Sequence, residues 1–277
     1  AHRRRCGWGR SRRTCGGPGM SAASLALHQV RYEQKSYWRN PAAAFFTFVF
    51  PIMFLVIFAS LNSGERIDFL GGLKYNQYYT PGIIAFGVIS ACYTNLAMTL
   101  SLRRDAGILK RLRGTPLPAS SMFGGLLGNS AIISIILVAL VTAIGIVFYG
   151  VTFPGHYLAL AAALLAGAAC FCAIGVAVSS LIPNADAAPA VVNAVLFPLL
   201  FISGVFFPVD PASLLAKIAN YFPIRHFVNA VFAAFDPRIP HRITAGFAGH
   251  DLLVVGLWAA GAAVFAVRRF RWEPGRR

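Results

Sequence analysis

The residues of this chain that could do chemistry are its ionisable ones, and the sequence keeps them out of its long apolar segments. No Asp, Glu, Lys, Arg or His occurs in six such segments, which span residues 42–61, 79–102, 124–148, 158–181, 188–207 and 252–267. A transporter driven by protons or sodium ions needs an ionisable or coordinating group at membrane depth. The sequence therefore disfavours an ion-coupled secondary transporter and a passive channel, the alternatives within the transport class.

The chain also lacks the residues for hydrolysing ATP. No stretch matches the Gly-x-x-x-x-Gly-Lys-[Ser/Thr] loop that holds nucleotide phosphates. A polytopic membrane enzyme is the other alternative, and it would need His, Asp or Cys side chains gathered near the bilayer surface. Nothing in the sequence indicates that the candidate catalytic residues lie close together. They are His156, His226, His241, Asp236 and Asp251. If the protein moves a molecule against a gradient, the energy must come from a partner.

The segment best suited to receive that energy is the charged stretch at residues 103–118. Helical periodicity gives it a small apolar stripe beside an acidic residue, a separate basic face and a stop signal. Asp105 lies beside the apolar stripe of Ile108, Leu109 and Leu112. Arg104 and Arg111 form the basic face, and Gly114 followed by Pro116 is the stop signal. Such a short helix could dock into a groove on a cytoplasmic protein. The alternative is an ordinary basic loop whose periodicity is accidental.

The elements that position this segment are predicted to be membrane-spanning helices. The composition is 57% hydrophobic and 12% charged, far more apolar than the roughly 45–50% and 25% of soluble domains. A helix needs about 20 apolar residues to cross the hydrocarbon core. We therefore expect an all-α, polytopic membrane protein with six transmembrane helices, in which Pro51 and Pro198 are tolerated as kinks.

The distribution of Lys and Arg predicts that both termini are cytoplasmic. From Met20 onward, basic residues concentrate in the N-terminal segment, in the loop after the second apolar segment and in the tail. Six membrane crossings would place these three regions on the same side of the membrane. Cytoplasmic loops carry such an excess. Because the residues behind the formal charge of +16 cluster between apolar segments, no nucleic-acid partner is expected.

Two further stretches are predicted to be helices outside the six segments. Residues 21–39 mix apolar and charged side chains and end in Tyr37 and Trp38, which suits an interfacial helix at the headgroup level. Apolar residues also recur at helical spacing over 214–222 and, after Pro223, over 227–235. We expect external re-entrant helices there, between spans five and six; the alternative is an exposed loop.

Residues 1–19 are set apart from the single transmembrane domain at 20–277. They are rich in Arg, and no apolar run follows closely enough for a secretory signal. We interpret them as a disordered extension, or as residues upstream of the true start at Met20. The alternative is a basic arm that touches anionic lipid. Cys92, Cys170 and Cys172 lie inside apolar segments as small hydrophobic residues, so we expect no disulfide.

The string from Arg104 to Leu117 resembles the signature of the type-2 class of ATP-binding-cassette (ABC) exporter permeases. In that class an acidic residue and Gly precede a Leu-Lys-Arg-Leu core and a Thr-Pro-Leu ending; Asp105 stands where Glu is more usual, which keeps the charge. The resemblance covers Met20 to Val267. Other stretches agree in order and spacing: Arg39-Asn40-Pro41 with Pro51, Thr80-Pro81-Gly82, and Ile202-Ser203-Gly204 followed by Phe207-Pro208, Pro211, Leu214, Ile218-Ala219, Pro223 and His226.

The resemblance implies a permease subunit that exports a hydrophobic drug, antibiotic or lipid-like molecule and has no enzyme activity or cofactor of its own. A separate ATPase subunit would bind ATP and Mg, and a second permease copy or a paralogue would complete the pathway, in the plasma (inner) membrane of a bacterium. Residues 21–39 would flank the ATPase contact, and the turn at 183–186 would add a smaller one. The residues implied to couple to the ATPase are Arg104, Asp105, Gly107, Ile108, Leu109, Arg111, Leu112, Thr115 and Pro116.

A few polar side chains inside the apolar segments are candidates for a substrate pathway. Ser90 and Thr94 are four residues apart, as are Asn95 and Thr99, and Asn193 is the amide of the fifth segment. Uncharged, aromatic-rich segments fit a hydrophobic cargo. The alternative is that these side chains form hydrogen bonds between packed helices.

Overall fold

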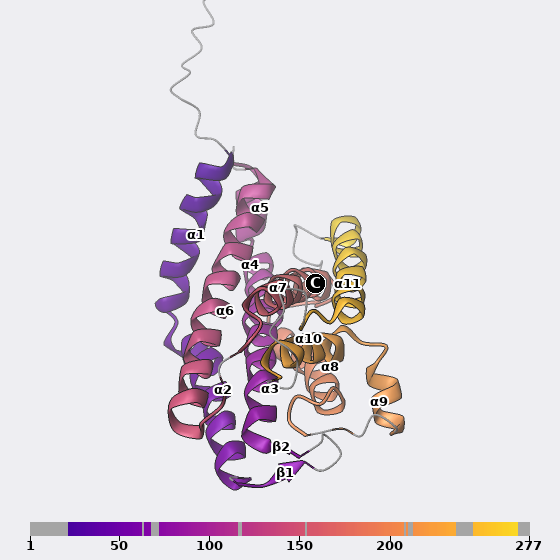
Figure 1. Cartoon of the computed structure of the whole chain (residues 1–277). Coiled ribbons are helices and arrows are strands. Elements are labelled where there is room, and N and C mark those ends of the chain that lie inside the picture. Colours follow the sequence, from indigo (N-terminus) through magenta and orange to yellow (C-terminus); the bar gives the residue numbers. More distant parts are fainter. Residues whose placement is uncertain are drawn as a thin grey trace, which may run out of the picture.

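The described part of the chain is mainly helical, as the sequence predicts. The computed structural model describes residues 22–62, 64–67, 72–115, 118–152, 154–207, 209, 213–236 and 246–270 (Figure 1). Within these ranges, the strands are β1 (Arg66–Ile67) and β2 (Leu73–Lys74), an antiparallel pair with Arg66 opposite Lys74. The predictions for residues 1–19 lie outside the described residues.

The first two helices, α1 (Ala22–Trp38) and α2 (Pro41–Leu61), meet at Asn40. The side-chain oxygen of Asn40 accepts a hydrogen bond from the Ala43 amide at 3.2 Å, and Pro41 occupies the first helical position. Proline suits that position because its missing N–H has no partner within the helix there. α2 continues through Pro51 and agrees with the predicted segment 42–61.

α1 runs lengthwise beside the first half of α6 (Ala119–Tyr149), so it does not lie across the bundle as a flat surface helix would (Figure 1). Glycines on α6 make this contact close. A Cβ atom on Gly125 would lie 2.3 Å from Gln29 Cγ, and one on Gly128 would lie 2.6 Å from a methyl group of Val30. That α1 sits at the headgroup level stays a prediction.

The second predicted segment is part of one longer helix. α3 (Tyr75–Ile89), the π-helical turn η2 (Ser90–Thr94) and α4 (Asn95–Asp105) follow one another without interruption. The π turn lies against α7 (Tyr157–Ser179), where a Cβ atom on Gly175 would lie 2.9 Å from the Tyr93 carbonyl oxygen. Gly175 therefore lets α7 approach the main chain of the π turn, a type of turn that is frequent at functional sites.

Five helices among the described residues are long and apolar enough to cross a membrane: α2, the α3–η2–α4 helix, α6, α7 and α11 (Gly249–Arg269). They overlap the predicted segments 42–61, 79–102, 124–148, 158–181 and 252–267. The helices are not all parallel, because α7 is seen nearly end-on in Figure 1 whereas α6 runs down the view. α7 packs against α11 and joins it to α4.

The fifth predicted segment, 188–207, is helical only in its first part. α8 (Ala188–Ile202) has 15 residues, about 22 Å of helix, which is shorter than the roughly 30 Å hydrocarbon core. The chain then turns at Gly204, whose φ is +86°, a conformation that glycine adopts without strain. The Tyr78 hydroxyl donates to the Gly204 carbonyl and holds this turn against α3. The count of six spans therefore stays a prediction.

Two helices follow the turn where the sequence predicts apolar helices, namely α9 (Leu214–Ala219) and α10 (Pro223–Phe235). α10 packs against α3, α7 and α11. Its Phe227 is fully buried, and a Cβ atom on Gly167 of α7 would lie 2.2 Å from the Phe227 ring. Whether α9 and α10 enter the outer leaflet stays a prediction.

Contacts at the two ends of α6 show which helix ends lie together. The Phe123 ring, near the start of α6, lies 5.4 Å from the Phe270 ring, just after α11, and α1 covers the same part of α6. At the opposite end of α6, the Tyr149 hydroxyl lies 3.2 Å from the Ser60 hydroxyl at the end of α2. α1 and the end of α11 thus share one end of the molecule; its cytoplasmic location stays a prediction.

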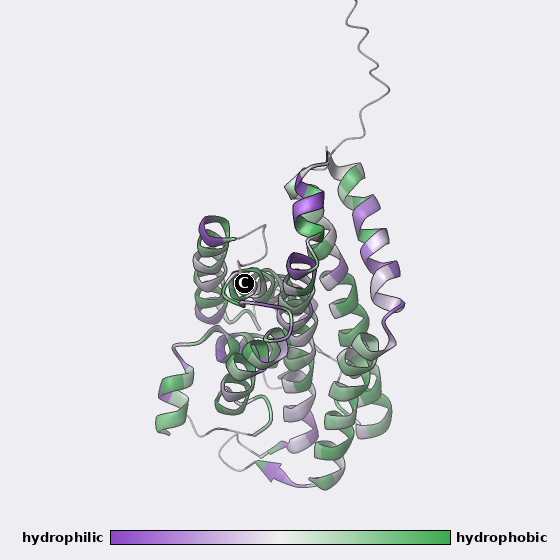
Figure 2. Ribbon diagram, turned by 180° about the vertical axis from the view of Figure 1, so that it is seen from behind, coloured by the Kyte–Doolittle hydropathy of each residue, from purple (hydrophilic) through white to green (hydrophobic). Residues whose placement is uncertain are grey.

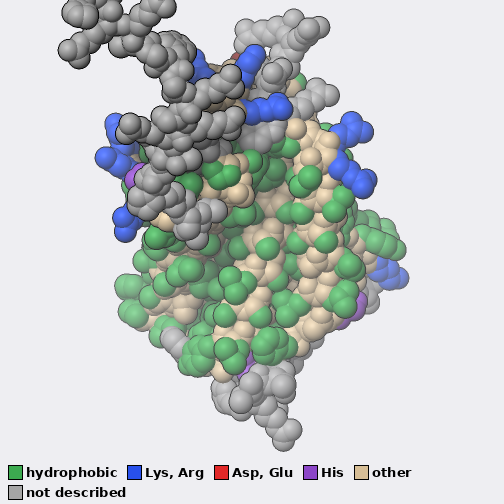
Figure 3. Space-filling view, turned by 90° about the horizontal axis from the view of Figure 1, so that it is seen from above, with side chains coloured by type: hydrophobic (Ala, Val, Ile, Leu, Met, Phe, Trp, Pro, Cys, Tyr) green, Lys and Arg blue, Asp and Glu red, His purple; other side chains and the backbone are tan. Residues whose placement is uncertain are grey.

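Hydrophilic residues follow this division. In Figure 2 the helices are hydrophobic along much of their length, and hydrophilic residues gather in α1, in the segment after α4 and in the β1–β2 hairpin. Figure 3 shows a face on which hydrophobic side chains predominate, with Lys and Arg toward its margins. Many large apolar side chains are exposed, including Phe46 on α2, Ile135 on α6 and Leu257 on α11. Surfaces of this kind suit a lipid environment.

Candidate coupling site

The segment predicted to couple to a partner forms a sharp corner. α4 ends at Asp105, and α5 (Ile108–Arg113) begins after two intervening residues. Gly107 at the corner has a φ of +69°, the left-handed conformation that glycine adopts without strain. The helix expected within residues 103–118 is therefore broken at Gly107, a position that helical periodicity did not mark as a break.

The predicted apolar stripe of this segment is divided between the core and the surface. Leu109 is fully buried and Leu112 is partly buried against the core, whereas Ile108 is 42% exposed. The basic side chains Lys110, Arg111 and Arg113 are exposed, as is Thr115. The outward face of α5 is thus one isoleucine surrounded by basic residues, and Leu109 anchors the helix from below. Pro116 lies outside the described residues.

Arg104 belongs to the interior of the corner. Its side chain is buried, and its guanidinium donates hydrogen bonds to the main-chain oxygens of Ser179, at 2.7 Å, and Ile182. Ser179 is the last residue of α7, where carbonyl groups lack helical partners and the helix dipole favours a positive charge, and Ile182 lies just after the helix. Arg104 therefore ties α4 to the end of α7 and to the turn that follows, which was predicted as a second partner contact. Asn184 and Asp186 of that turn are exposed.

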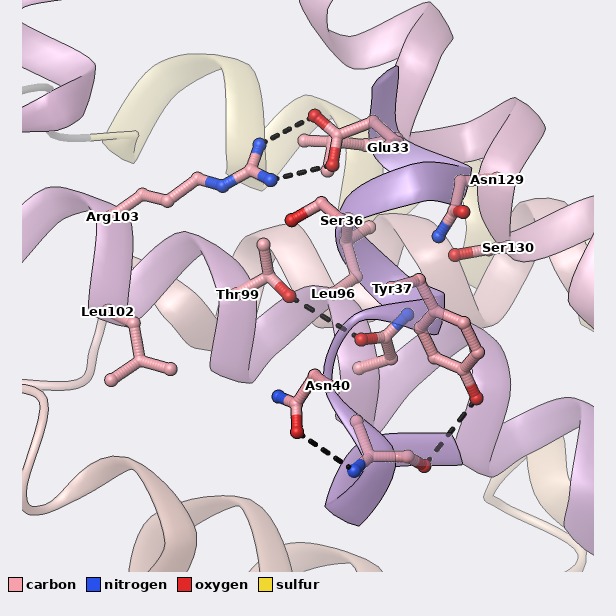
Figure 4. Close-up of a pocket in the computed structure, with 13 residues that line it drawn as sticks. Glu33, Ser36, Tyr37, Asn40, Leu96, Thr99, Leu102, Arg103, Asn129 and Ser130 are labelled. Atoms are coloured by element: carbon pink, nitrogen blue, oxygen red, sulfur yellow. Dashed lines mark hydrogen bonds and ion pairs between the residues drawn. The ribbon is translucent and has the colours of Figure 1, made fainter. Parts of the chain in front are cut away.

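The neighbouring Arg103 ties the corner to α1. Its two terminal nitrogens bind the two carboxylate oxygens of Glu33 at 2.7 and 2.6 Å (Figure 4). The side chain of Glu33 is 4% exposed and that of Arg103 is 16% exposed. A paired, two-point contact of this kind is the strongest form of ion pair between these side chains. Two adjacent arginines thus connect α4 in opposite directions, to α1 and to α7.

A polar cavity of about 170 Å³ lies beneath the Glu33–Arg103 ion pair, between α1, α4 and α6 (Figure 4). Within it, the Thr99 hydroxyl donates to Asn95 Oδ1 at 3.4 Å. Asn129 Oδ1 is buried and has no hydrogen-bond partner among the described residues. Burial raises the pKa of the Tyr37 phenol, so this hydroxyl stays a neutral donor toward the Ala43 carbonyl at 3.5 Å. The cavity is polar but has no unpaired charge among the residues described around it.

Comparison with known protein families decides what class of protein carries this corner. The family model of the ABC-2 type transporter matches residues 27–235, which is most of the chain. The chain belongs to the ABC-2 type transporter family. The match includes most of α1, the α4–α5 corner and the helices up to the end of α10, so the resemblance found in the motif at residues 104–117 is confirmed.

Curated relatives of this ABC-2 transporter chain agree with the assignment. The inner membrane transport permease YadH of Escherichia coli (strain K12) is 28% identical over 191 residues, which cover 65% of this chain and 73% of the relative. The permease of the same name from Shigella flexneri matches with the same identity and coverage. The chain is therefore a multi-pass membrane protein and a permease component of an ABC-2 transporter.

The residues predicted to line a pathway in this permease are only partly brought together. Ser90 and Thr94 lie in the π turn, and the half-buried Asn193 follows Val192, whose carbonyl accepts from the Tyr93 hydroxyl at 3.3 Å. Asn95 lines the polar cavity instead, with Thr99. Thr94 Oγ1 is buried and has no hydrogen-bond partner among the described residues. Their role as a pathway stays a prediction.

Sequence reasoning missed three features of the site: the Glu33–Arg103 pair, the inward direction of Arg104, and the Asn129 side of the cavity. Glu33 carried a signal, because it is the one acidic residue of α1. Its partner lies 70 residues away, and no local spacing could have identified it.

Proposed function

We propose that this chain is the permease subunit of an exporter in the inner membrane, which moves a hydrophobic drug, antibiotic or lipid-like molecule using ATP hydrolysed by a separate ABC ATPase. The observation that carries the proposal is the α4–α5 corner. It presents Ile108 among exposed basic residues at the end of the molecule that α1 and the end of α11 share (Figure 1). An exposed apolar residue with a cationic rim suits a groove on a protein partner.

The corner is built to transmit a movement of α5 into the membrane helices. Leu109 anchors α5 in the core, and Arg103 and Arg104 bind α4 to α1 and α7. A partner that presses on Ile108 would therefore displace three helices together, since charge-assisted and buried hydrogen bonds resist separation. ATP and Mg would bind to the partner subunit, which would hydrolyse the nucleotide.

A second copy of this chain, or a paralogous permease, is proposed to complete the pathway. Exposed apolar side chains on α8, such as Phe197 and Phe201, support this arrangement because they could be covered by another transmembrane unit. The six apolar segments contain no charged residue. A pathway between them would therefore suit an apolar cargo.

Substitution of the outward face of α5 tests the partner contact. We expect Ile108→Asp combined with Arg111→Glu to reduce co-purification of the permease with its proposed ABC ATPase at least tenfold, because the change places negative charge where an apolar and basic surface would dock. The measurement is the ATPase-to-permease ratio in detergent-solubilised membranes. Leu109→Asp is unsuitable for this test because Leu109 is buried.

The control is Ile218→Asp on α9, since Ile218 and Ile108 are equally exposed, at 42%. Ile218 lies in the segment predicted to be external, so this change should leave co-purification intact. If the doubly substituted permease retained the ATPase as well as the Ile218→Asp control, the corner would not be the coupling contact.

A further inference from the structure

Three potential metal ligands meet where α10 and α11 begin. His226 lies in the first turn of α10, and His250 and Asp251 lie in the first turn of α11. Each offers one donor atom, and the three donor atoms lie within 4.8 Å of one another. His226 is 5% exposed, Asp251 is partly buried, and His250 is exposed. The cluster is separate from the coupling corner, and the transport proposal makes no use of it.

The hydrogen bonds of His226 fix which of its nitrogens can bind a cation. Its Nε2 atom lies 2.9 Å from the main-chain oxygen of Asn220. A carbonyl oxygen can only accept, so Nε2 must carry a hydrogen. The Nδ1 atom faces Asp251 Oδ1 at 2.6 Å. Atoms 2.6 Å apart share a proton in a hydrogen bond. For a metal ion to bind both at roughly 2.0–2.2 Å, a small rotation of the side chains must move the two atoms apart.

The surroundings of His226 are those of a metal ligand. Histidines that bind a metal usually donate their other N–H to a carbonyl or carboxylate, which fixes the tautomer and the direction of the ring. The ring of His250 lies 5.5 Å from that of His226, centroid to centroid, at an interplanar angle of 58°. Because His250 is exposed, its side chain can rotate until a ring nitrogen lies roughly 2.0–2.1 Å from a bound Zn²⁺, the usual Zn–N distance.

We propose that His226, His250 and Asp251 bind a first-row divalent transition-metal ion such as Zn²⁺ and thereby fasten α10 to the start of α11. Two imidazoles and one carboxylate suit Zn²⁺, with a water in the fourth position, whereas Mg²⁺ and Ca²⁺ prefer oxygen ligands alone. Asn229 Nδ2 lies 3.5 Å from Asp251 Oδ1 and helps to orient the carboxylate. The site joins the segment after α8 to the last span, and its occupancy does not depend on the ATPase.

The test uses the full chain, purified in detergent through a tag without histidine and stripped of metal with a chelator. We expect titration with Co²⁺ to give the strong visible absorption of tetrahedral coordination at one ion per chain, and Zn²⁺ to displace it. His250→Ala should weaken binding at least tenfold. Because His250 is exposed, this variant should fold normally even if a change at the buried His226 does not.

The matched control is His28→Ala, which removes an exposed histidine on α1, far from the cluster in sequence. It should bind Co²⁺ as the unchanged chain does. Zn²⁺ should also raise the unfolding temperature of the unchanged chain and of His28→Ala, but not that of His250→Ala. Equal binding by the unchanged chain and His250→Ala, or absorption typical of octahedral Co²⁺, would overturn the proposed site.

Discussion

Replacing Arg104 by alanine is expected to lower the free energy of unfolding by about 3–5 kcal/mol. The change removes the donors that satisfy the buried main-chain oxygens of Ser179 and Ile182. Each buried acceptor left without a partner costs about 1–3 kcal/mol, and the end of α7 also loses a favourable positive charge. The measurement is the unfolding midpoint of the purified permease in mixed micelles with increasing fractions of SDS.

Two variants accompany Arg104→Ala. Arg104→Lys keeps the charge but has no planar fork to bridge two acceptors, so it should fall between the alanine variant and the unchanged chain. Arg113→Ala removes an exposed arginine of α5 and should change the midpoint little. If Arg104→Ala were as stable as Arg113→Ala, then Arg104 would not hold the end of α7 to α4.

Replacing Glu33 by alanine is expected to cost about 2–3 kcal/mol, since it strands the charge of Arg103 in a largely buried position. Breaking one partner of a fully buried pair costs about 3–5 kcal/mol, and the expectation is lower here because the Arg103 side chain is 16% exposed beside a polar cavity. The same SDS titration measures the loss, and substrate-stimulated ATPase activity of the assembled transporter should fall with it.

A double-mutant cycle separates the ion pair from general damage to α1. Glu33→Ala with Arg103→Ala should lose less stability than the two single changes together, because neither charge is then left alone. Glu33→Gln keeps two polar atoms toward Arg103 and should be milder than Glu33→Ala. Strictly additive losses in the cycle would mean that the Glu33–Arg103 pair does not link α1 to α4.

The fold was predictable where physics is local. An uncharged run of about 20 residues must lie in lipid or in a core, so α2, α6, α7 and α11 follow from hydropathy. The end of α8 did not follow, because residues 203–207 are as apolar as a span, and only their packing on α3 shows that they turn. The π turn at Ser90–Thr94 likewise reflects contact with Gly175 on another helix.

At the candidate site, too, some features follow from the local sequence and others depend on packing against distant residues. Periodicity identified an apolar stripe in the segment after α4, but a stripe can face the protein's own core or a partner. Leu109 faces the core and Ile108 faces outward, although they are neighbours in sequence. The directions of Arg103 and Arg104 depend on acceptors on α1 and α7, which are 70 and 75 residues away. A single sequence contains no record of such pairings, whereas the motif at residues 104–117 was enough to indicate the family.

Transport by the reconstituted permease, with and without its ATPase, is the most direct test of the proposed function. Liposomes would contain a lipophilic fluorescent compound and the permease alone, the permease with the ABC ATPase, or the Ile108→Asp, Arg111→Glu variant with that ATPase. We expect uphill movement of the compound only with ATP and the unchanged pair of proteins. Uphill movement by the permease alone, driven by a pH or sodium gradient, would contradict the proposal.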